Sequence, residues 1–220
     1  MLLAPGERTE VLVAPTAAGS YVLRTKGYDR GSAGMGGGMM GGGGSSSGTA
    51  DQILAAMVVS GSETTAAPLP TRLVSDAALD AGAAGPERPI TLAMGTGSSS
   101  GGMGGGMGGN GGMMSFTING ESFDPNRINI SAKLGTTEDW VIANTSAMDH
   151  PFHLHAWPFR VIERSSGPQA MAGWKDTVNV PANGTVRIRI PFTDIVGRTV
   201  YHCHILDHED QGMMGVIQVR

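Results

Sequence analysis

The sequence predicts an all-β protein. Short runs rich in Val, Ile, Thr and aromatic residues alternate with Gly, Pro, Asn and Asp, a spacing typical of strands and turns. No long segment carries the 3.6-residue apolar period of an amphipathic helix. Together these observations favour a sandwich of short strands over a helical or mixed fold.

Three strands are predicted before residue 62: RTEVLVAP (8–15), GSYVLRTKGY (19–28) and QILAAMVVSG (52–61). A Gly/Met-rich insert, 31–48, precedes the third. Because three strands do not make a sandwich, residues 1–61 are expected to be the C-terminal strands of a partial domain. The Pro/Ala-rich residues 62–88 are predicted to form a linker with a helical turn inside it.

Residues 89–220 are predicted to form one complete Greek-key sandwich. A second Gly/Met-rich insert, 95–114, follows its first strand. The strand candidates are PITLAMG, SFTINGESF, INISAKLG, TEDWVIANT, FHLHAWPFRVIER, DTVNVPANGTVRIRIPF, TVYHCHILD and GVIQVR.

Composition excludes several classes of partner. Nineteen acidic residues against fifteen basic ones give a formal charge of -4 with no block of Lys or Arg, so nucleic acid is not an expected partner. No apolar run approaches the ~20 residues that cross a bilayer, and MLLAPGERTE lacks the segments of a secretory signal. Cys203 is the single cysteine, which excludes an intramolecular disulfide and leaves a buried hydrophobe or a metal ligand.

All six histidines lie in two short motifs, HPFHLH (150–155) and HCHILDH (202–208). Successive side chains of a strand point to opposite faces, so Cys203 faces away from the histidines on either side of it. The same parity separates His150 from the other two histidines of its motif. Two metal sites on opposite sides of one strand are therefore predicted. The first holds His150, Cys203 and His208, and the second holds His153, His155, His202 and His204.

The first predicted site has the composition of a blue copper site. Two imidazoles, a thiolate and a weak axial thioether form that ligand set, and Met213 or Met214 is placed to supply the thioether. The even spacing of 203, 208 and 213 favours Met213. Two alternatives stand beside this interpretation: core residues whose polar atoms are satisfied by the backbone, and a structural zinc site. Zinc does not explain two sites back to back.

The motifs DHPFHLHAWPFRVIE and YHCHILDHEDQGMMG resemble the two C-terminal copper signatures of the multicopper oxidases, the family of laccases and bacterial cuprous oxidases. The resemblance covers 88–220 and includes INGESFDPNRI and AGWKDTVNVPANGTVRI. It implies a cupredoxin-like sandwich and a periplasmic or secreted location. By resemblance, the type 1 copper ligands are His150, Cys203, His208 and Met213, the type 2 ligand is His153, and the type 3 ligands are His155, His202 and His204.

The family shares its three-copper cluster between its first and last domains, and the first supplies two further pairs of histidines. All six histidines are already used here, so a complete type 1 site and half of a cluster are expected. The implied partners are one or more missing N-terminal cupredoxin domains, absent through truncation or supplied by a second chain.

The resemblance also implies a reaction. Electrons from cuprous ion or a phenolic reductant enter at the type 1 copper, pass through Cys203 and an adjacent histidine, and reduce dioxygen to water at the cluster. Glu209 is a candidate proton relay or orienting group, with a solvated acid as the alternative. Asp176 is expected to anchor its turn. The second hypothesis is an electron-transfer or copper-binding cupredoxin that uses only the type 1 site, and copper nitrite reductases rank third.

Methionines in and near the inserts resemble those of the copper-tolerance branch of the family, in which cuprous ion is the substrate. Soft thioethers select cuprous ion. The carboxylate that this branch carries four residues before the first type 1 histidine is replaced by Ser146, with Asp149 as a candidate substitute. A plain low-complexity linker is the alternative. The candidate methionines are Met94, Met103, Met107, Met113, Met114 and Met148, together with Met35, Met39 and Met40 of the first insert.

Overall fold

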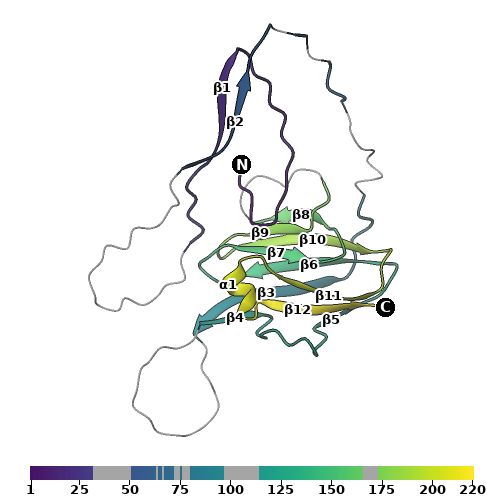
Figure 1. Cartoon of the computed structure of the whole chain (residues 1–220). Coiled ribbons are helices and arrows are strands. Elements are labelled where there is room, and N and C mark those ends of the chain that lie inside the picture. The colour runs from purple at the N-terminus through teal and green to yellow at the C-terminus, as the bar shows by residue number, and fades with distance from the viewer. Residues whose placement is uncertain are drawn as a thin grey trace, which may run out of the picture.

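The computed structural model describes residues 1–31, 51–62, 64–65, 67–71, 75, 80–96, 114–165 and 173–220 (Figure 1). Within these ranges two five-stranded sheets pack against each other. The first has the order β4-β3-β6-β10-β8, formed by Met114–Ile118, Glu87–Thr96, Thr136–Asn144, Thr185–Phe192 and Arg160–Arg164. The second has the order β5-β12-β11-β7-β9, formed by Ile130–Ala132, Met214–Val219, Gly197–Cys203, His150–Leu154 and Thr177–Val180.

Alternating apolar residues build the core between these sheets. In β10 every second side chain is fully buried, and the residues between them are half-buried. Trp140 of β6 contacts Phe152 of β7 and Tyr201 of β11 edge-on, with ring centroids 6.2 and 5.6 Å apart. Burial of each such side chain contributes about 2 kcal/mol. The predicted all-β, cupredoxin-like sandwich is confirmed.

The boundaries of several predicted strands need correction. The candidate FHLHAWPFRVIER is two strands, β7 and β8, because Ala156 has a φ of 70° and Pro158 follows it. The candidate SFTINGESF ends at Ile118, where Asn119 and Gly120 turn the chain with positive φ. The candidate TVYHCHILD ends as a strand at Cys203 and continues into the short helix α1 (Leu206–Asp210).

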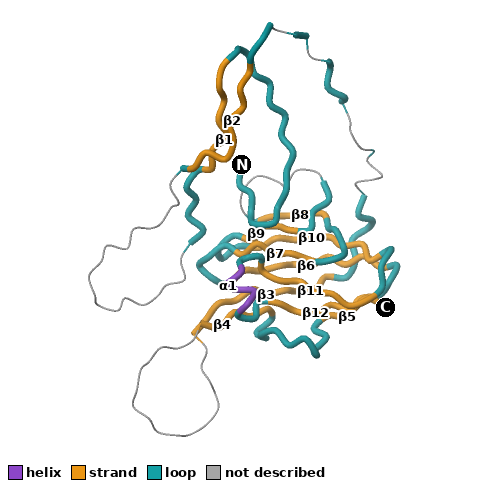
Figure 2. The backbone as a smooth tube through the Cα atoms, in the orientation of Figure 1, coloured by secondary structure: helices purple, strands orange, loops and turns teal. Residues whose placement is uncertain are grey.

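The N-terminal strands form a separate two-stranded hairpin of β1 (Gly19–Thr25) and β2 (Gln52–Val59), which projects from the sandwich in Figure 2. The strand predicted at 8–15 is wrong. This segment has extended or irregular backbone without a partner strand in the described part of the chain, and a strand needs a ladder of interstrand hydrogen bonds. The helical turn predicted in the linker falls partly outside the described residues. No helix in the described ranges is long and apolar enough to span a membrane.

Candidate metal centre

Strand β11 carries side chains of two histidine-rich groups on its opposite faces. In the antiparallel pairing of β11 with β7, Cys203 lies opposite Phe152 and His202 lies opposite His153. Directly opposed residues share a face. Cys203 therefore points with the fully buried Phe152 into the core, and His202 points with His153 to the other side of the sheet.

The inner group consists of His150, Cys203 and His208, all of them buried. Cys203 Sγ lies 3.5 Å from Nδ1 of His150 and 3.6 Å from Nδ1 of His208, and the two nitrogens are 3.2 Å apart. The centre of such a triangle lies about 2 Å from each corner, the length of a metal–ligand bond. The three donor atoms thus converge on one point.

Neighbouring side chains fix the two imidazoles of the inner group. Ser146 Oγ lies 2.7 Å from His150 Nε2. Its single proton has carbonyl acceptors on Asn144 and Met148, so the hydroxyl accepts from the Nε2–H of His150 and leaves Nδ1 with a free lone pair. Phe116 of β4 stacks on His208, with ring centroids 4.6 Å apart and planes inclined by 28°.

Burial determines the protonation of these donors. Desolvation is the main cause that lowers the pKa of His150 and of His208 to about 4, so both imidazoles are neutral near pH 7. Desolvation also raises the pKa of the Cys203 thiol to about 12. A metal ion bound here takes the place of the thiol proton.

Met213 adjoins the inner group through its backbone. Its N–H donates to the carbonyl of His208 at 2.9 Å, and its carbonyl accepts from the N–H of Cys203 at 3.1 Å. The side chain is fully buried. Met214, by contrast, is half-buried and pairs with His202 across β12 and β11.

The outer group consists of His153, His155, His202 and His204. Donor nitrogens of the first three lie within 4.8 Å of one another, and the Nε2 atoms of His155 and His202 are 3.0 Å apart. The ring of His204 lies 5.3 Å from that of His153 and 5.5 Å from that of His202, between centroids. Burial lowers the pKa values of His153 and His155. Four imidazoles are thus gathered on one side of the sheet.

Glu209 and Asp176 both lie against the outer group. Glu209 Oε2 is 3.1 Å from Nδ1 of His202, and a quarter of the Glu209 side chain is exposed. The backbone carbonyl of Asp176 accepts from Nδ1 of His153 at 2.8 Å, and its carboxylate pairs with Arg8 at 2.6 Å. Asp176 therefore contacts His153 through its backbone and Arg8 through its carboxylate, while the carboxylate of Glu209 contacts His202.

Of the candidate methionines, Met94, Met114 and Met148 lie in the described residues, and the first two flank the second insert. Met94 in β3 pairs with Phe116 in β4, and both Met94 and Met114 pack against the core. Met148 is half-buried and bridges to Gly31. The candidates Met35, Met39, Met40, Met103, Met107 and Met113 lie outside the described residues.

The sequence did not reveal the contacts that orient the histidines. Three contacts were not predicted: those of the Ser146 hydroxyl, of the Phe116 ring, and of the Thr177 hydroxyl, whose Oγ1 lies 2.9 Å from Nδ1 of His153. The four-residue spacing from Ser146 to His150 and the position of Thr177 beside Asp176 are the signals that point to two of these contacts. The oxygens of Asp149, the candidate substitute for the missing carboxylate, accept from Tyr28, Asn179 and the N–H of Ala182.

Comparison with known proteins places these groups in a family context. The family model described as multicopper oxidase matches residues 97–220. A multicopper oxidase of Staphylococcus haemolyticus is 42% identical over 109 residues, covering 47% of this chain and 24% of that protein. A laccase of Bacillus subtilis is 41% identical over 102 residues, covering 37% of this chain and 20% of that protein.

Structural comparison gives a similar result. A multicopper oxidase from Campylobacter jejuni, described as a metallo-oxidase, superposes with a TM-score of 0.68 and 30% identity over 94% of this chain and 42% of that chain. The chain therefore spans about a quarter of the first curated relative and less than half of this solved structure.

Proposed function

Because this chain belongs to the multicopper oxidase family, we propose that it is the copper-binding C-terminal part of an oxidase with a type 1 copper and a trinuclear cluster. In this proposal electrons from a reductant reach dioxygen, which is reduced to water. The triangle of Cys203 Sγ and two imidazole Nδ1 atoms is the observation that supports it most strongly.

The inner group fits a type 1 copper site. Copper accepts a thiolate and two neutral imidazoles, and would supply one-electron redox chemistry here. His150, Cys203 and His208 would hold it, together with Met213. The three donor atoms are buried and already converge on one point, so binding a metal ion would require little rearrangement of the chain.

The outer group supports half of a trinuclear cluster. His153 would ligate the type 2 copper, and His155, His202 and His204 the type 3 pair. Cys203 is covalently adjacent to His202 and His204, so the chain itself joins the two groups through a few bonds. Glu209 contacts His202 and is partly exposed, which supports a role in holding or relaying a proton.

The β1–β2 hairpin supports a partner that supplies the rest of the cluster. Val22, Leu23, Ile53, Leu54 and Val58 are exposed in it, whereas apolar side chains of the sandwich strands are mostly buried. Such a surface fits the remaining strands of a cupredoxin domain. We propose that one or more N-terminal cupredoxin domains cover this hairpin and contribute the other cluster histidines, in a periplasmic or secreted enzyme.

We further propose cuprous ion as a reductant, with phenols as the other class. The second insert leaves and rejoins the sandwich at the ends of β3 and β4, and Phe116, two residues after Met114, stacks on His208. Thioethers anchored here would concentrate soft ions beside the inner group.

The second candidate function is an electron-transfer or copper-binding cupredoxin that uses the inner group alone. It is favoured by one observation: the inner donor set is complete within this chain. Oxidase activity of an assembly that contains the missing domains distinguishes the two, since an electron carrier would show none.

Copper reconstitution tests the shared basis of both functions. The purified chain titrated with cupric ion is expected to develop one intense visible thiolate-to-copper absorption band, and Cys203→Ser is expected to abolish it. Arg198→Gln, at an exposed position in β11, serves as a matched control. A band that survives the serine substitution would contradict the type 1 assignment.

A further inference from the structure

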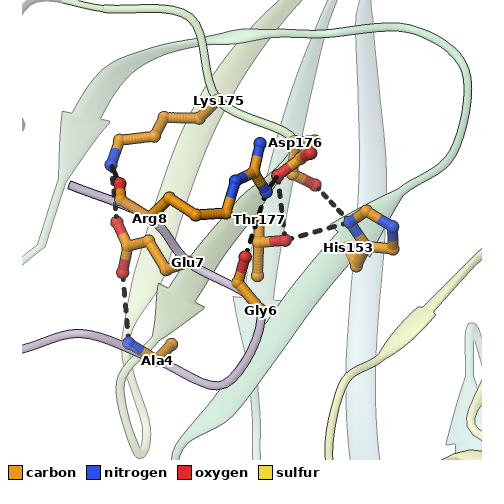
Figure 3. Close-up of polar contacts among 8 residues, drawn as sticks. All are labelled: Ala4, Gly6, Glu7, Arg8, His153, Lys175, Asp176 and Thr177. Carbon is orange, nitrogen blue, oxygen red and sulfur yellow. Dashed lines mark hydrogen bonds and ion pairs between the residues drawn. The ribbon is translucent and has the colours of Figure 1, made fainter.

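Residues 4–8, hereafter the clasp, lie against the turn that holds His153 (Figure 3). Arg8 pairs with the carboxylate of Asp176 at 2.6 Å. Lys175 Nζ lies 3.1 Å from Glu7 Oε1 and donates to the carbonyl of Arg8 at 3.1 Å. Three polar contacts thus join two segments that are about 170 residues apart in the sequence.

The clasp holds its own conformation. The N–H of Glu7 donates to the carbonyl of Ala4 at 3.0 Å, and the Glu7 carboxylate accepts from the N–H of Ala4 at 3.2 Å. Gly6 turns the chain between them with a φ of 79°. Because these hydrogen bonds fix the conformation of the clasp, the clasp can fix the positions of the side chains that it contacts.

A chain of hydrogen bonds leads from the clasp to His153. The carbonyl of Asp176 can only accept, so Nδ1 of His153 carries the proton and its Nε2 lone pair stays free for a metal. Thr177 Oγ1 lies 2.9 Å from the same Nδ1 and donates to Asp176 Oδ1 at 3.1 Å. Arg8 binds that same Oδ1. The guanidinium therefore fixes the carboxylate that orients the threonine hydroxyl.

The backbone of the clasp also limits a second histidine. A Cβ atom at Gly6 would lie 2.8 Å from both Cδ2 and Nε2 of His204. The backbone at Gly6 thus lies against the imidazole and restricts its rotation. The clasp therefore acts on two of the four outer histidines: it contacts His204 at Gly6 and reaches His153 through the hydrogen bonds that begin at Arg8.

We propose that the clasp is a positioning element for the outer group: Arg8, through Asp176 and Thr177, fixes the orientation of the His153 ring, and Gly6 restricts His204. The expected effect on copper affinity rests on the proposed function, whereas the effect on the orientation of the His153 and His204 rings does not. The Arg8 side chain is 72% exposed, so its ion pair contributes little to folding stability. Groups that orient a metal-binding histidine typically change metal affinity by about 10- to 100-fold.

Ring ¹⁵N spectra of the metal-free chain test the route through Arg8. We expect the His153 ring in the wild-type chain to give one sharp set of Nδ1–H signals, and Arg8→Gln and Thr177→Val to shift or broaden these signals, because the ring is held less tightly. Thr177→Ser keeps the hydroxyl and is expected to retain the wild-type ring signals. Arg127→Gln removes another surface ion pair, with Glu121 at 3.2 Å, and is the matched control. Unchanged His153 ring signals in both Arg8→Gln and Thr177→Val, or the same change in Arg127→Gln, would overturn the proposal.

A pair of glycine variants tests the contact with His204. Gly6 and Gly120 have nearly equal φ values, 79° and 78°, but a Cβ at Gly120 would meet no atom within 4 Å. Gly6→Ala is expected to shift the ring signals of His204 and to lower the affinity of the outer group for cupric ion about tenfold, measured by competition with a chelator. Gly120→Ala carries the same backbone strain and is expected to change neither. Equal effects of both variants would contradict a role for the contact. If the wild-type outer group binds no cupric ion, the proposed function is refuted. The spectra of the metal-free chain would still decide the role of the clasp.

Discussion

The hydroxyl of Ser146 lies 2.7 Å from Nε2 of His150, and both side chains are buried. A neutral group therefore orients this imidazole at the position where the resemblance to the copper-tolerance branch implies a carboxylate. The bond directs Nδ1 of His150 toward Cys203 and His208 without adding a charge to the inner group.

Ser146→Ala is expected to weaken the inner group. The substitution leaves the buried Nε2–H of His150 without its acceptor, which costs about 1–3 kcal/mol of the free energy of unfolding. Affinity for cupric ion is expected to fall about tenfold. Urea unfolding of the metal-free chain and titration of the visible thiolate band measure the two effects. Ser146→Thr keeps the hydroxyl and is expected to retain both properties. Wild-type affinity in the alanine variant would show that the hydrogen bond has no positioning role.

The isolated chain is expected not to reduce dioxygen at a useful rate. Its four outer histidines leave three coppers under-ligated, because the proposed cluster needs eight imidazoles. An oxygen electrode with a phenolic reductant should record only background consumption from the copper-loaded chain. Assembly with a polypeptide that supplies the missing cupredoxin domains should raise the rate. Steady consumption by the isolated chain would contradict the half-cluster proposal.

Acid is expected to destabilise the metal-free chain between pH 6.5 and about 4. The pKa values of His150 and His208 fall from 6.5 to about 4 on folding, so below pH 6.5 the unfolded state binds more protons than the folded state. The stabilisation is complete above pH 6.5 and is lost as the pH falls toward 4. Each histidine contributes up to about 3 kcal/mol to this change.

Urea unfolding at several pH values from 7 to 4.5 measures this loss. His208→Asn removes one of the two groups, and its stability is expected to decline about half as steeply with acid. A wild-type free energy of unfolding that stays constant over this range would show that the two imidazoles are not desolvated in the folded chain.

The sandwich and the grouping of histidines follow from local patterns. Strand parity alone places Cys203 and His202 on opposite faces, and the register of β11 with β7 has that arrangement. The strand predicted at 8–15 failed because alternation reports a preference for extended backbone but does not supply a partner strand. Contacts between distant segments, such as Arg8 with Asp176, depend on the tertiary fold, and a single sequence carries no signal for them.

The last prediction concerns the methionines of the second insert in the complete enzyme. Replacing Met103, Met107 and Met113 with serine is expected to lower cuprous-ion oxidation at low copper concentration and to leave the visible thiolate band intact, because none of these thioethers belongs to the inner group. Met114 is kept, since it packs against the core and its loss would confuse a binding defect with a folding defect.

Two substrates compared side by side separate the roles of this insert. Oxidation of a bulky phenol by the triple variant is expected to stay level or improve. The insert leaves the sandwich close to Phe116 and thus to His208, where it would partly cover the electron entry point against a bulky substrate. Replacement of the same three methionines with leucine keeps the apolar volume and removes the sulfur, so it should reproduce the loss of cuprous-ion oxidation. A thioether acts only where a soft ion is the electron donor, so a copper-handling role predicts a loss with cuprous ion alone. Equal losses with both substrates would indicate a folding role of the insert, and unchanged rates with both would favour a plain linker.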